Sequence, residues 1–392
     1  MKIGINATFA RKPDAGMGQV TVNFLKNLIE NNNFKDTFFL YSEEDLTEDL
    51  KLPKNFKKRV LKTFYKRDDL FRKLFWEKYF LPLMVEKDNC QVFFSLYQSS
   101  TIFKKIPHLM MVHDTIPKIF PWYLNNWRKK IYHKQVDKGI GGADKIMTVS
   151  KHSKIDINRI YGIEKDKISV NYIDCDPIFK QAVSKKENKK IIEKHKLEKS
   201  KYIFYIGGFD MRKNINGLIR SYGMLWEKYK NKKECPDLVL AGKFIPHLVP
   251  LVTDIEKEIR EVRKIYKIPQ NKFKQLGFVN QKDLPTLYAK AKLLCFPSLY
   301  EGFGLPVLEA FNVGCPVVTS ENSSLKEIAN KKNAFIFDLE YDKSLADKMW
   351  EALNSNEKQI DKKISQAQKD AEKFEWKVFT RKVLNELKSL NR

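Results

Sequence analysis

The sequence contains few cysteines, and their spacing does not fit the usual cysteine sites. Five cysteines are scattered over the 392 residues, and no two of them form a CxxC pair. An odd number without paired spacing argues against a disulfide framework and against a zinc site. We therefore expect the protein to function in a reducing compartment such as the cytosol.

Long apolar runs are also missing. Runs such as HLVPLV (247–252) fall far short of the roughly 20 apolar residues that a helix needs to cross a bilayer. The first residues, MKIGINATF, alternate as in a strand and lack the long apolar core of a secretory signal. We expect a cytoplasmic protein that is soluble or peripheral on the inner face of the cell membrane.

Patterns of metal ligands are missing too. Apart from His113, the histidines show no ligand spacing with acidic residues, and no DxD-like acidic cluster stands in a suitable place. Metal sites in proteins need such clusters. We expect a protein that uses neither a metal ion nor a cofactor.

What the sequence has in excess is positive charge. Lysine and arginine number 73 against 48 aspartates and glutamates, which gives a formal net charge of +25. This excess indicates anionic partners. We expect no specific nucleic acid, because no DNA- or RNA-binding module is recognisable. A basic nucleic-acid-binding protein nevertheless stays open as an alternative.

The densest basic stretch is residues 51–84, in which aromatic residues are interspersed with lysine and arginine. Its aromatic residues include Phe56, Phe64, Tyr65, Phe71, Phe75 and Trp76. A basic and aromatic helical segment is typical of a protein that lies on an anionic membrane surface. An ordinary half-buried helix, whose lysine stems cover apolar surface, explains the same residues. Both interpretations stay open.

The order of strand-like and helix-like runs predicts the fold. Runs such as KIGINAT (2–8) and YIFYIGG (202–208) alternate with helical runs, and this alternation occurs twice, with a charged stretch (176–190) between. The pattern predicts two doubly wound, parallel-sheet, Rossmann-like α/β domains that face each other across a cleft. We divide the chain into an N-terminal domain (1–178), a linker (179–200), a C-terminal domain (201–372) and a final helix that crosses back to the N-terminal domain (373–392).

The segment GGFDMRKNINGLI (207–219) opens a helix directly after an apolar strand. Its two glycines allow a tight turn, and Arg212 and Lys213 stand where the helix begins and backbone N–H groups point at a ligand. This combination predicts a phosphate site that is neither a GxGxxG motif nor a Walker loop. Glycines needed for packing and two solvated cations remain the alternative.

The segment EGFGLPVLEAFNVG (301–314) places Glu301 and Glu309 on either side of a glycine turn. Gly304 lets the backbone approach a ligand, and Pro306 suits the start of a helix. Near the first turn, Glu309 is in reach of a ribose diol, while Glu301 faces a sugar hydroxyl or a developing positive charge. Alternatively, Glu309 is an ordinary first-turn acid that the helix dipole favours.

Two further candidates lie in the N-terminal half. RKPDAGMGQ places Gly16 and Gly18 between the first strand and a helix, where the backbone can approach a diphosphate or an acceptor. MVHDTIPKIFP (111–121) ends a strand with His113 and Asp114, and active sites of α/β proteins are built from such strand ends. A hydrogen-bonded histidine and a turn aspartate are the alternative.

Taken together, these segments resemble the retaining GT-B glycosyltransferases of the group 1 type, glycosyltransferase family 4. The resemblance covers nearly the whole chain and is strongest from about 202 to 340, which contains the Glu-x7-Glu pattern around GFGLPVLE. HDTIP (113–117) is similar to the form found in bacterial mannosyltransferase-like members that build surface polysaccharides.

The resemblance implies roles for the candidate residues. In the C-terminal domain, Arg212 and Lys213 bind the diphosphate of an NDP-sugar donor, and Glu309 binds the ribose hydroxyls. The sugar and phosphate are held by Glu301 and the backbone of Phe303, Gly304 and Leu305. From the N-terminal domain, Gly16 and Gly18 close over the diphosphate, and His113, next to Asp114, approaches the reacting carbon.

Three positions depart from the family pattern. Gln19 stands where relatives commonly carry a basic residue, and Gly208 stands where some carry a second arginine. NYIDCD (171–176) replaces the usual PNGVD. These departures leave Arg212 and Lys213 to carry the positive charge at the diphosphate.

The resemblance implies a retaining, metal-independent hexosyltransferase in which cations and helix N-termini stabilise the leaving diphosphate. We expect mannose to pass from GDP-mannose to a lipid-linked or polysaccharide acceptor in cell-surface glycan synthesis, such as that of lipopolysaccharide. Loops around 97–103 and 122–127 are expected to contact the acceptor. An NDP-sugar epimerase on the same fold is the alternative enzyme.

Overall fold

The protein consists of two compact units. The structure, a computed structural model, describes residues 1–13, 16–31, 35–46, 50–61, 69–243 and 251–391. Unit 1 contains Met1–Asp174 and Phe374–Arg392, and unit 2 contains Cys175–Lys373. The chain therefore leaves unit 1 once and returns to it in its last helix.

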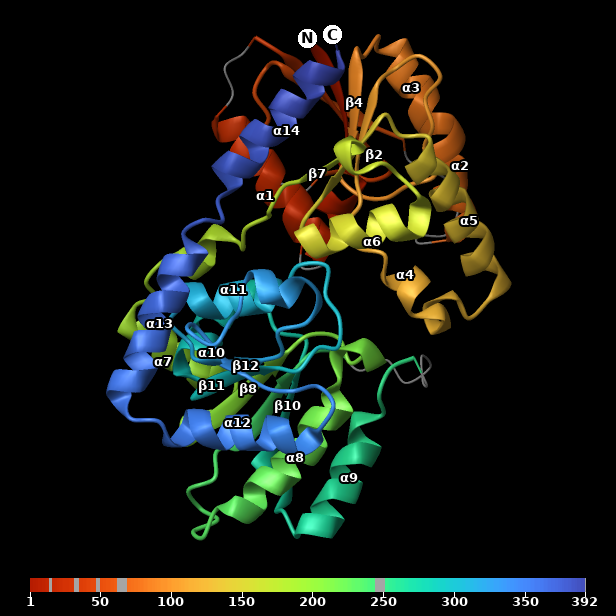
Figure 1. Cartoon of the computed structure of the whole chain (residues 1–392). Coiled ribbons are helices and arrows are strands. Elements are labelled where there is room, and N and C mark those ends of the chain that lie inside the picture. The colour runs from red at the N-terminus through yellow and green to blue at the C-terminus, as the bar shows by residue number, and fades with distance from the viewer. Residues whose placement is uncertain (14–15, 32–34, 47–49, 62–68, 244–250, 392) are drawn as a thin grey trace. The chain divides into compact units, whose positions relative to one another are not determined.

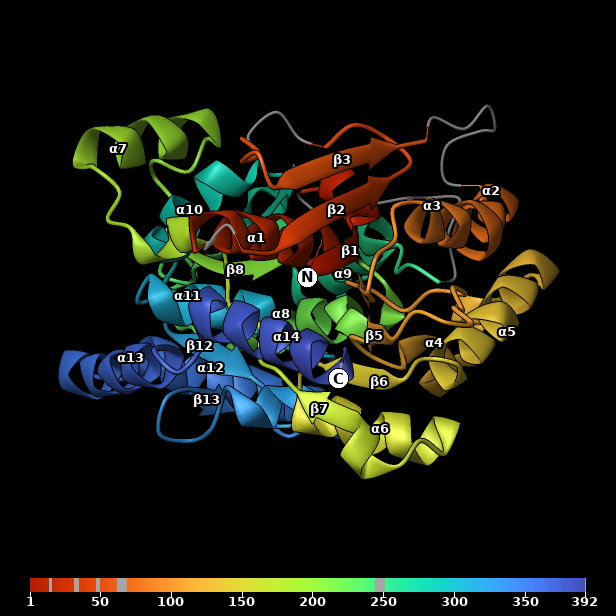
Figure 2. The same ribbon diagram turned by 90° about the horizontal axis from the view of Figure 1, so that it is seen from above.

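A parallel sheet forms the centre of unit 1. Within the described ranges it has seven strands in the order β3-β2-β1-β4-β5-β6-β7, and every pairing is parallel. The strands are β1 (Lys2–Asn6), β2 (Thr37–Ser42), β3 (Phe56–Val60), β4 (Val92–Ser95), β5 (His108–Met111), β6 (Lys145–Thr148) and β7 (Ile168–Val170). Figure 2 shows β1, β2 and β3 side by side. All four residues of β4 (VFFS) are buried, as expected for a strand covered on both faces.

Helices connect these strands. They are α1 (Gly16–Glu30), α2 (Leu70–Phe75), α3 (Leu81–Lys87), α4 (Ile116–Ile119), α5 (Trp127–Gly141), α6 (Lys151–Tyr161) and α14 (Trp376–Leu390). One π-helical turn, η2 (Trp76–Phe80), joins α2 to α3. Side-chain caps begin α5 and α6, where Asn126 and Ser150 each accept a hydrogen bond from a backbone N–H of the first turn. α14 packs on α1, and the rings of Phe379 and Phe24 are 5.8 Å apart.

Unit 2 repeats this plan around a second parallel sheet. In the part of the chain that is described, its strand order is β10-β9-β8-β11-β12-β13. The strands are β8 (Tyr202–Ile206), β9 (Asp237–Ala241), β10 (Phe273–Gly277), β11 (Leu293–Phe296), β12 (Val317–Thr319) and β13 (Phe335–Ile336). The helices are α7 (Lys185–Lys194), α8 (Ile215–Lys228), α9 (Ile255–Tyr266), α10 (Leu284–Lys290), α11 (Leu305–Asn312), α12 (Asp342–Asn354) and α13 (Glu357–Ala371). In Figure 1, α8 and α12 lie on one face of this sheet and α10 and α11 on the other.

The expected fold, two doubly wound parallel α/β domains, is confirmed. Residues 179–200, which the composition assigns to a linker, contain helix α7 and belong to unit 2. The last residues form α14 and belong to unit 1. Among the described helices, none combines the length and the apolar character that crossing a membrane requires.

Residues 51–84 are not one basic helical segment, and that part of the prediction is wrong. Residues 56–60 form the edge strand β3, in which Phe56 is buried and stacks on Phe38 with ring centroids 4.7 Å apart. Lysines that point outward from an edge strand hinder pairing with another chain. Trp76 is also buried, whereas Phe71 and Phe75 are exposed. Two of the predicted aromatic residues, Phe64 and Tyr65, lie outside the described residues.

Candidate functional site

The strand order of unit 2 creates a position where α/β proteins build ligand sites. β8 lies between β9 and β11, so the connections from β8 and from β11 run to opposite sides of the sheet. In open α/β sheets, ligands bind outside the carboxyl ends of the strands at such a position. Residues 207–214 follow β8, and residues 297–304 follow β11.

Three charged side chains from these loops meet at this position, and we call them the charged triad: Arg212, Lys213 and Glu301. Lys213 Nζ lies 2.6 Å from Glu301 Oε1, and Arg212 Nη1 lies 2.9 Å from Glu301 Oε2. The side chains of all three are only 11–12% exposed. The structure therefore brings the two cations predicted for the diphosphate into direct contact with the carboxylate predicted for the sugar.

The carboxylate of Glu301 is held in place by its neighbours. Ser298 Oγ donates to Glu301 Oε1 (2.5 Å), and the backbone N–H of Glu301 donates to Ser323 Oγ (2.9 Å). Burial acts to raise the pKa of Glu301, but Lys213 and Arg212 lower it by more, so its pKa lies below the usual value. Glu301 is therefore ionised at neutral pH.

The start of α11 lies next to Glu301 in the chain. Gly304 has φ of +119°, and a Cβ there would lie 2.7 Å from a methyl carbon of Leu325, so both the backbone and the packing require glycine. Leu305 is the first residue of α11, where backbone N–H groups have no partner within the helix. The carbonyl of buried Phe303 accepts a hydrogen bond from Ser324 Oγ (2.8 Å). The N-terminal end of α11 thus adds partial positive charge beside the charged triad.

Glu309 lies deeper in α11 than its sequence position suggested. Because the helix begins at Leu305, Glu309 is in the second turn, and its buried Oε2 accepts a hydrogen bond from the hydroxyl of Tyr288 (2.7 Å). Burial raises the pKa of Glu309 to about 7, although the bond from Tyr288 acts in the opposite direction. The interpretation of Glu309 as an ordinary first-turn acid is wrong, and its contact with a ribose stays a prediction.

We expect Glu309→Gln to remove a pH dependence of protein stability. The folded pKa of about 7 exceeds the value of about 4.3 for an unfolded chain, so the folded protein binds more protons between these two values. The free energy of unfolding of the wild type therefore falls as the pH rises through this window, by up to roughly 3 kcal/mol. Glutamine cannot ionise and avoids the loss.

Urea unfolding at about pH 5 and about pH 8 measures this effect. The exposed Glu86, changed to glutamine, is the control and should follow the wild type. If the stability of Glu309→Gln falls with pH as steeply as that of the wild type, the assigned burial of this carboxyl is wrong.

The two glycines of unit 1 lie inside a helix rather than before it. α1 begins at Gly16, so Gly16 and Gly18 both occupy its first turn. A Cβ at Gly18 would lie 1.7 Å from the carbonyl oxygen of Lys12, so close packing of the backbone requires this glycine. A Cβ at Gly16 would meet nothing within 4 Å. Contact of either glycine with a diphosphate stays a prediction.

His113 and Asp114 lie at the carboxyl end of β5. His113 Nε2 donates to the carbonyl of Leu96 (2.8 Å), which leaves Nδ1 as the ring nitrogen that accepts a proton. Burial lowers the pKa of His113, so the ring is neutral near pH 7. Asp114 Oδ1 accepts a hydrogen bond from the N–H of Ile116 (3.0 Å), a turn that leads into α4. His113 is thus fixed by hydrogen bonds, and its contact with a sugar stays a prediction.

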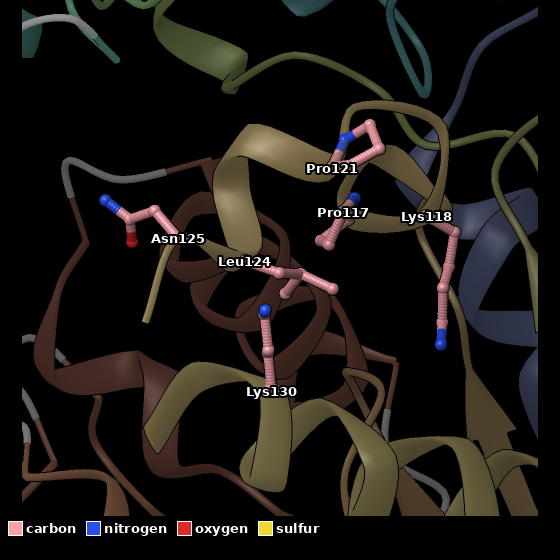
Figure 3. Close-up of a pocket in the computed structure, with 6 residues that line it drawn as sticks. All are labelled: Pro117, Lys118, Pro121, Leu124, Asn125 and Lys130. Atoms are coloured by element: carbon pink, nitrogen blue, oxygen red, sulfur yellow. The ribbon is translucent and has the colours of Figure 1, made fainter. Parts of the chain in front are cut away.

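A pocket of about 550 Å³ opens beside α4 and is lined by Pro117, Lys118, Pro121, Leu124, Asn125 and Lys130. In Figure 3, Pro117, Leu124 and the end of Lys130 lie together, whereas Lys118 lies to one side. Lys118 Nζ pairs with Asp137 Oδ2 (2.5 Å). Prolines fix the backbone of this wall. The lining residues overlap the 122–127 loop that the sequence analysis expects to contact an acceptor.

A buried carboxylate in unit 1, Glu77, was not predicted. Tyr97 and Tyr132 each donate to Glu77 Oε1 (3.1 Å), and the N–H and the hydroxyl of Ser100 both donate to Oε2 (2.8 Å). Burial raises the pKa of both tyrosines, so their hydroxyls remain protonated. Lys73 Nζ lies 3.8 Å from Glu77 Oε1 and 4.7 Å from the ring centre of Tyr132. The sequence offered one signal for this cluster, because Tyr97 follows β4 and polar residues at the carboxyl ends of parallel strands often meet.

Neither unit offers an evident metal site in its described residues. No group of three or more histidine, cysteine, aspartate or glutamate side chains is arranged there to hold a metal ion. The charged triad combines one carboxylate with two cations, an arrangement that suits an anionic ligand.

Comparison with known sequences finds a similarity to a family model within unit 2. Residues 187–370 match the family described as Glycosyl transferases group 1. O-antigen chain mannosyltransferase B of Escherichia coli is 33% identical over 216 residues, which are 55% of this chain and 53% of that protein. O-antigen chain mannosyltransferase RfbU of Salmonella typhimurium is 26% identical over 261 residues, 65% of this chain and 62% of that protein. The chain spans about half the length of the first curated relatives it matches.

Solved structures extend the similarity to the whole fold. WaaG, a glycosyltransferase involved in lipopolysaccharide biosynthesis, aligns over 99% of both chains with a TM-score of 0.72 and 14% identity. Anabaena HepE, solved in complex with UDP and glucose, aligns over 99% of both chains with a TM-score of 0.71 and 17% identity. At such identities the similarity establishes the fold alone. The chain thus has the fold of these two glycosyltransferases, and its residues 187–370 are similar to the family described as Glycosyl transferases group 1.

Proposed function

We propose that the protein is a retaining glycosyltransferase that moves a hexose from an NDP-sugar to a glycan or lipid-linked acceptor without a metal ion. The observation that carries this proposal is the charged triad at the carboxyl ends of β8 and β11. Two cations with side chains only 11–12% exposed, beside the N-terminus of α11, would bind a diphosphate, which is the leaving group of the reaction.

The donor binds by exchange of anions. In the structure, Lys213 and Arg212 bind the carboxylate of Glu301. The diphosphate takes over these two cations, and Glu301 is freed to accept hydrogen bonds from hydroxyls of the transferred sugar. Glu309 binds the ribose hydroxyls, and the backbone of Phe303, Gly304 and Leu305 lies along the phosphate.

The chemical step breaks the bond between the anomeric carbon and the diphosphate oxygen. The electron pair moves to that oxygen, where Arg212, Lys213 and the N-terminus of α11 stabilise the negative charge. An acceptor hydroxyl attacks the same face of the sugar and passes its proton to the leaving phosphate, so the anomeric configuration is retained. His113, next to Asp114, approaches the transferred sugar near its reacting anomeric carbon.

The proposals for the sugar and for the acceptor are supported by similarity and by the pocket in unit 1. Two relatives are named O-antigen chain mannosyltransferases, which favours mannose from GDP-mannose and an acceptor in surface polysaccharide synthesis. The residues that line the pocket beside α4 follow His113 in the chain, and this pocket is the proposed acceptor site. The proposed location is the cytoplasmic face of the membrane, where a lipid-linked acceptor would be available.

We expect donor nucleotides to stabilise the protein against unfolding. A ligand that binds only the folded state, at about 100 times its Kd, adds roughly 2.7 kcal/mol to the free energy of unfolding. Thermal unfolding with a panel of NDP-sugars measures the shift and identifies the base and the sugar. Nucleoside monophosphates and free hexoses, which lack the diphosphate, are the controls and should give small shifts.

The absence of a shift with every NDP-sugar would contradict the proposed donor site. Product analysis separates the alternative enzyme, because an epimerase converts the nucleotide sugar in the absence of any acceptor. A glycosyltransferase releases NDP and lengthens the acceptor by one sugar.

A further inference from the structure

A row of exposed apolar side chains follows one edge of unit 1. α2, η2 and α3 continue into one another, and Phe71, Phe75, Tyr79 and Leu83 recur along them every four residues. Their exposed fractions rise along the row from 37% to 63%. Residues at this spacing lie on one face of a helix. A soluble surface rarely places large apolar side chains in such a row.

Helix α5 extends this row. The ring of Trp127, which is 59% exposed, lies 6.0 Å from the ring of Phe71, and Ile131 follows one turn later. The guanidinium of Arg128 lies over both rings, 5.6 Å from the centre of Phe71 and 5.5 Å from that of Trp127. We call this surface the aromatic face; its apolar residues are Phe71, Phe75, Tyr79, Phe80, Leu83, Trp127 and Ile131.

The exposed charge on the same elements is nearly all positive. On α2, η2, α3 and α5, all of which the structure describes, Glu86 is the one exposed acidic residue. The exposed basic residues are Lys78, Lys87, Arg128, Lys130, Lys134 and Lys138. The acidic Glu77 of the same segment is fully buried, so it does not belong to the exposed surface.

This composition distinguishes between two kinds of partner. Protein interfaces are enriched in aromatic residues and arginine but depleted in lysine. Here five of the six exposed basic residues are lysines. Apolar and aromatic side chains that enter the headgroup region, flanked by lysines that reach anionic lipid, are typical of proteins that lie on a bilayer.

We propose that unit 1 docks on an anionic lipid bilayer through the aromatic face. Of the segment 51–84 that the sequence suggests for membrane binding, only the helical part belongs to the aromatic face. The face also includes α5, which the sequence did not indicate. The biological purpose of this docking rests on the proposed function, since a lipid-linked acceptor would lie in the same bilayer. The binding itself is measured without any substrate.

The test is flotation of the full chain with vesicles of phosphatidylcholine, pure or with about one third phosphatidylglycerol. We expect the wild type to float mainly with the anionic vesicles. Tyr79→Ser combined with Leu83→Ser should lower the partition coefficient by about tenfold or more, because two exposed side chains no longer enter the lipid. Lys130→Gln and Lys134→Gln should each lower it by about fivefold on anionic vesicles only.

The control variant combines Tyr341→Ser with Ile265→Ser, two exposed residues of unit 2 with similar exposed fractions, 62% and 70%. It should float like the wild type. Trp127→Ser serves as a second variant in case the first does not fold, as judged by thermal unfolding. Equal flotation of wild type and folded variants, or no flotation of the wild type, would overturn the proposal. Self-association that the variants abolish would assign the face to a second copy instead.

These outcomes are separate from the donor site. If the protein fails to float but is stabilised by an NDP-sugar, only the proposed docking through the aromatic face is disproved. A protein that floats but responds to no NDP-sugar disproves the proposed function alone.

Discussion

Lys213→Ala and Glu301→Ala are each expected to lower the rate of NDP release, with donor and acceptor present, by about 100-fold or more. Removal of Lys213 takes away one of two cations that stabilise the leaving diphosphate, and Arg212 alone remains paired with Glu301. Removal of Glu301 leaves the two buried cations without their carboxylate and the sugar without its proposed partner. Release of the nucleoside diphosphate in a coupled assay gives the rates.

The matched control is an ion pair at the surface of the same unit. Lys348 Nζ lies 2.6 Å from Glu351 Oε2, and both side chains are more than one-third exposed. Lys348→Ala and Glu351→Ala should leave the rate unchanged, because exposed pairs contribute little. Turnover at wild-type rate in Lys213→Ala and Glu301→Ala would refute the assignment of the charged triad. Circular dichroism shows whether each variant is folded.

Glu77→Ala is expected to destabilise the protein by about 4 kcal/mol, a large part of the stability of an ordinary domain. The change leaves the hydroxyls of Tyr97 and Tyr132 and both donors of Ser100 buried without their acceptor. Each buried donor that loses its partner costs free energy, because water cannot replace the carboxylate. Urea unfolding measures the loss.

Two variants define this result. Glu77→Gln keeps the shape of the side chain and part of its accepting capacity, so its loss should be intermediate. Glu86→Ala changes an exposed carboxylate on the following helix α3 and should alter the free energy of unfolding by less than about 0.5 kcal/mol. If Glu77→Ala is as stable as Glu86→Ala, the hydrogen bonds that Glu77 accepts do not stabilise unit 1.

The sequence identifies the fold wherever strands are buried on both faces. β8 (YIFYI) and β11 (LLCF) read as continuous apolar runs, because both sides of a central parallel strand are covered. β3 (FKKRV) was missed because an edge strand can expose its lysines. The charge of residues 179–200 predicts a linker, yet Ser184 caps α7 and Glu187 stands three residues later, which is the pattern of a capping box.

The sequence identifies the residues of the candidate site but not their contacts. Each charged residue was found within its own motif, as a cation after a glycine turn or as an acid before a helix. The ion pair between Lys213 and Glu301 joins residues that are 88 positions apart, and it forms because β8 and β11 are neighbours in the sheet. The bond from Tyr288 to Glu309 likewise depends on where α10 packs. Strand neighbours and helix packing are properties of the folded chain, and local motifs do not specify them.

The contact of Glu301 with both cations has a consequence for turnover. After sugar transfer, the nucleoside diphosphate must leave a site with two buried positive charges, which would otherwise retain it. Glu301 competes with the diphosphate for the same two cations. Because Glu301 is part of the chain, its effective concentration at the two cations stays constant, whatever the concentration of nucleotide in solution. The protein therefore carries its own competitor of the product, and we expect this competition to favour product release over product inhibition.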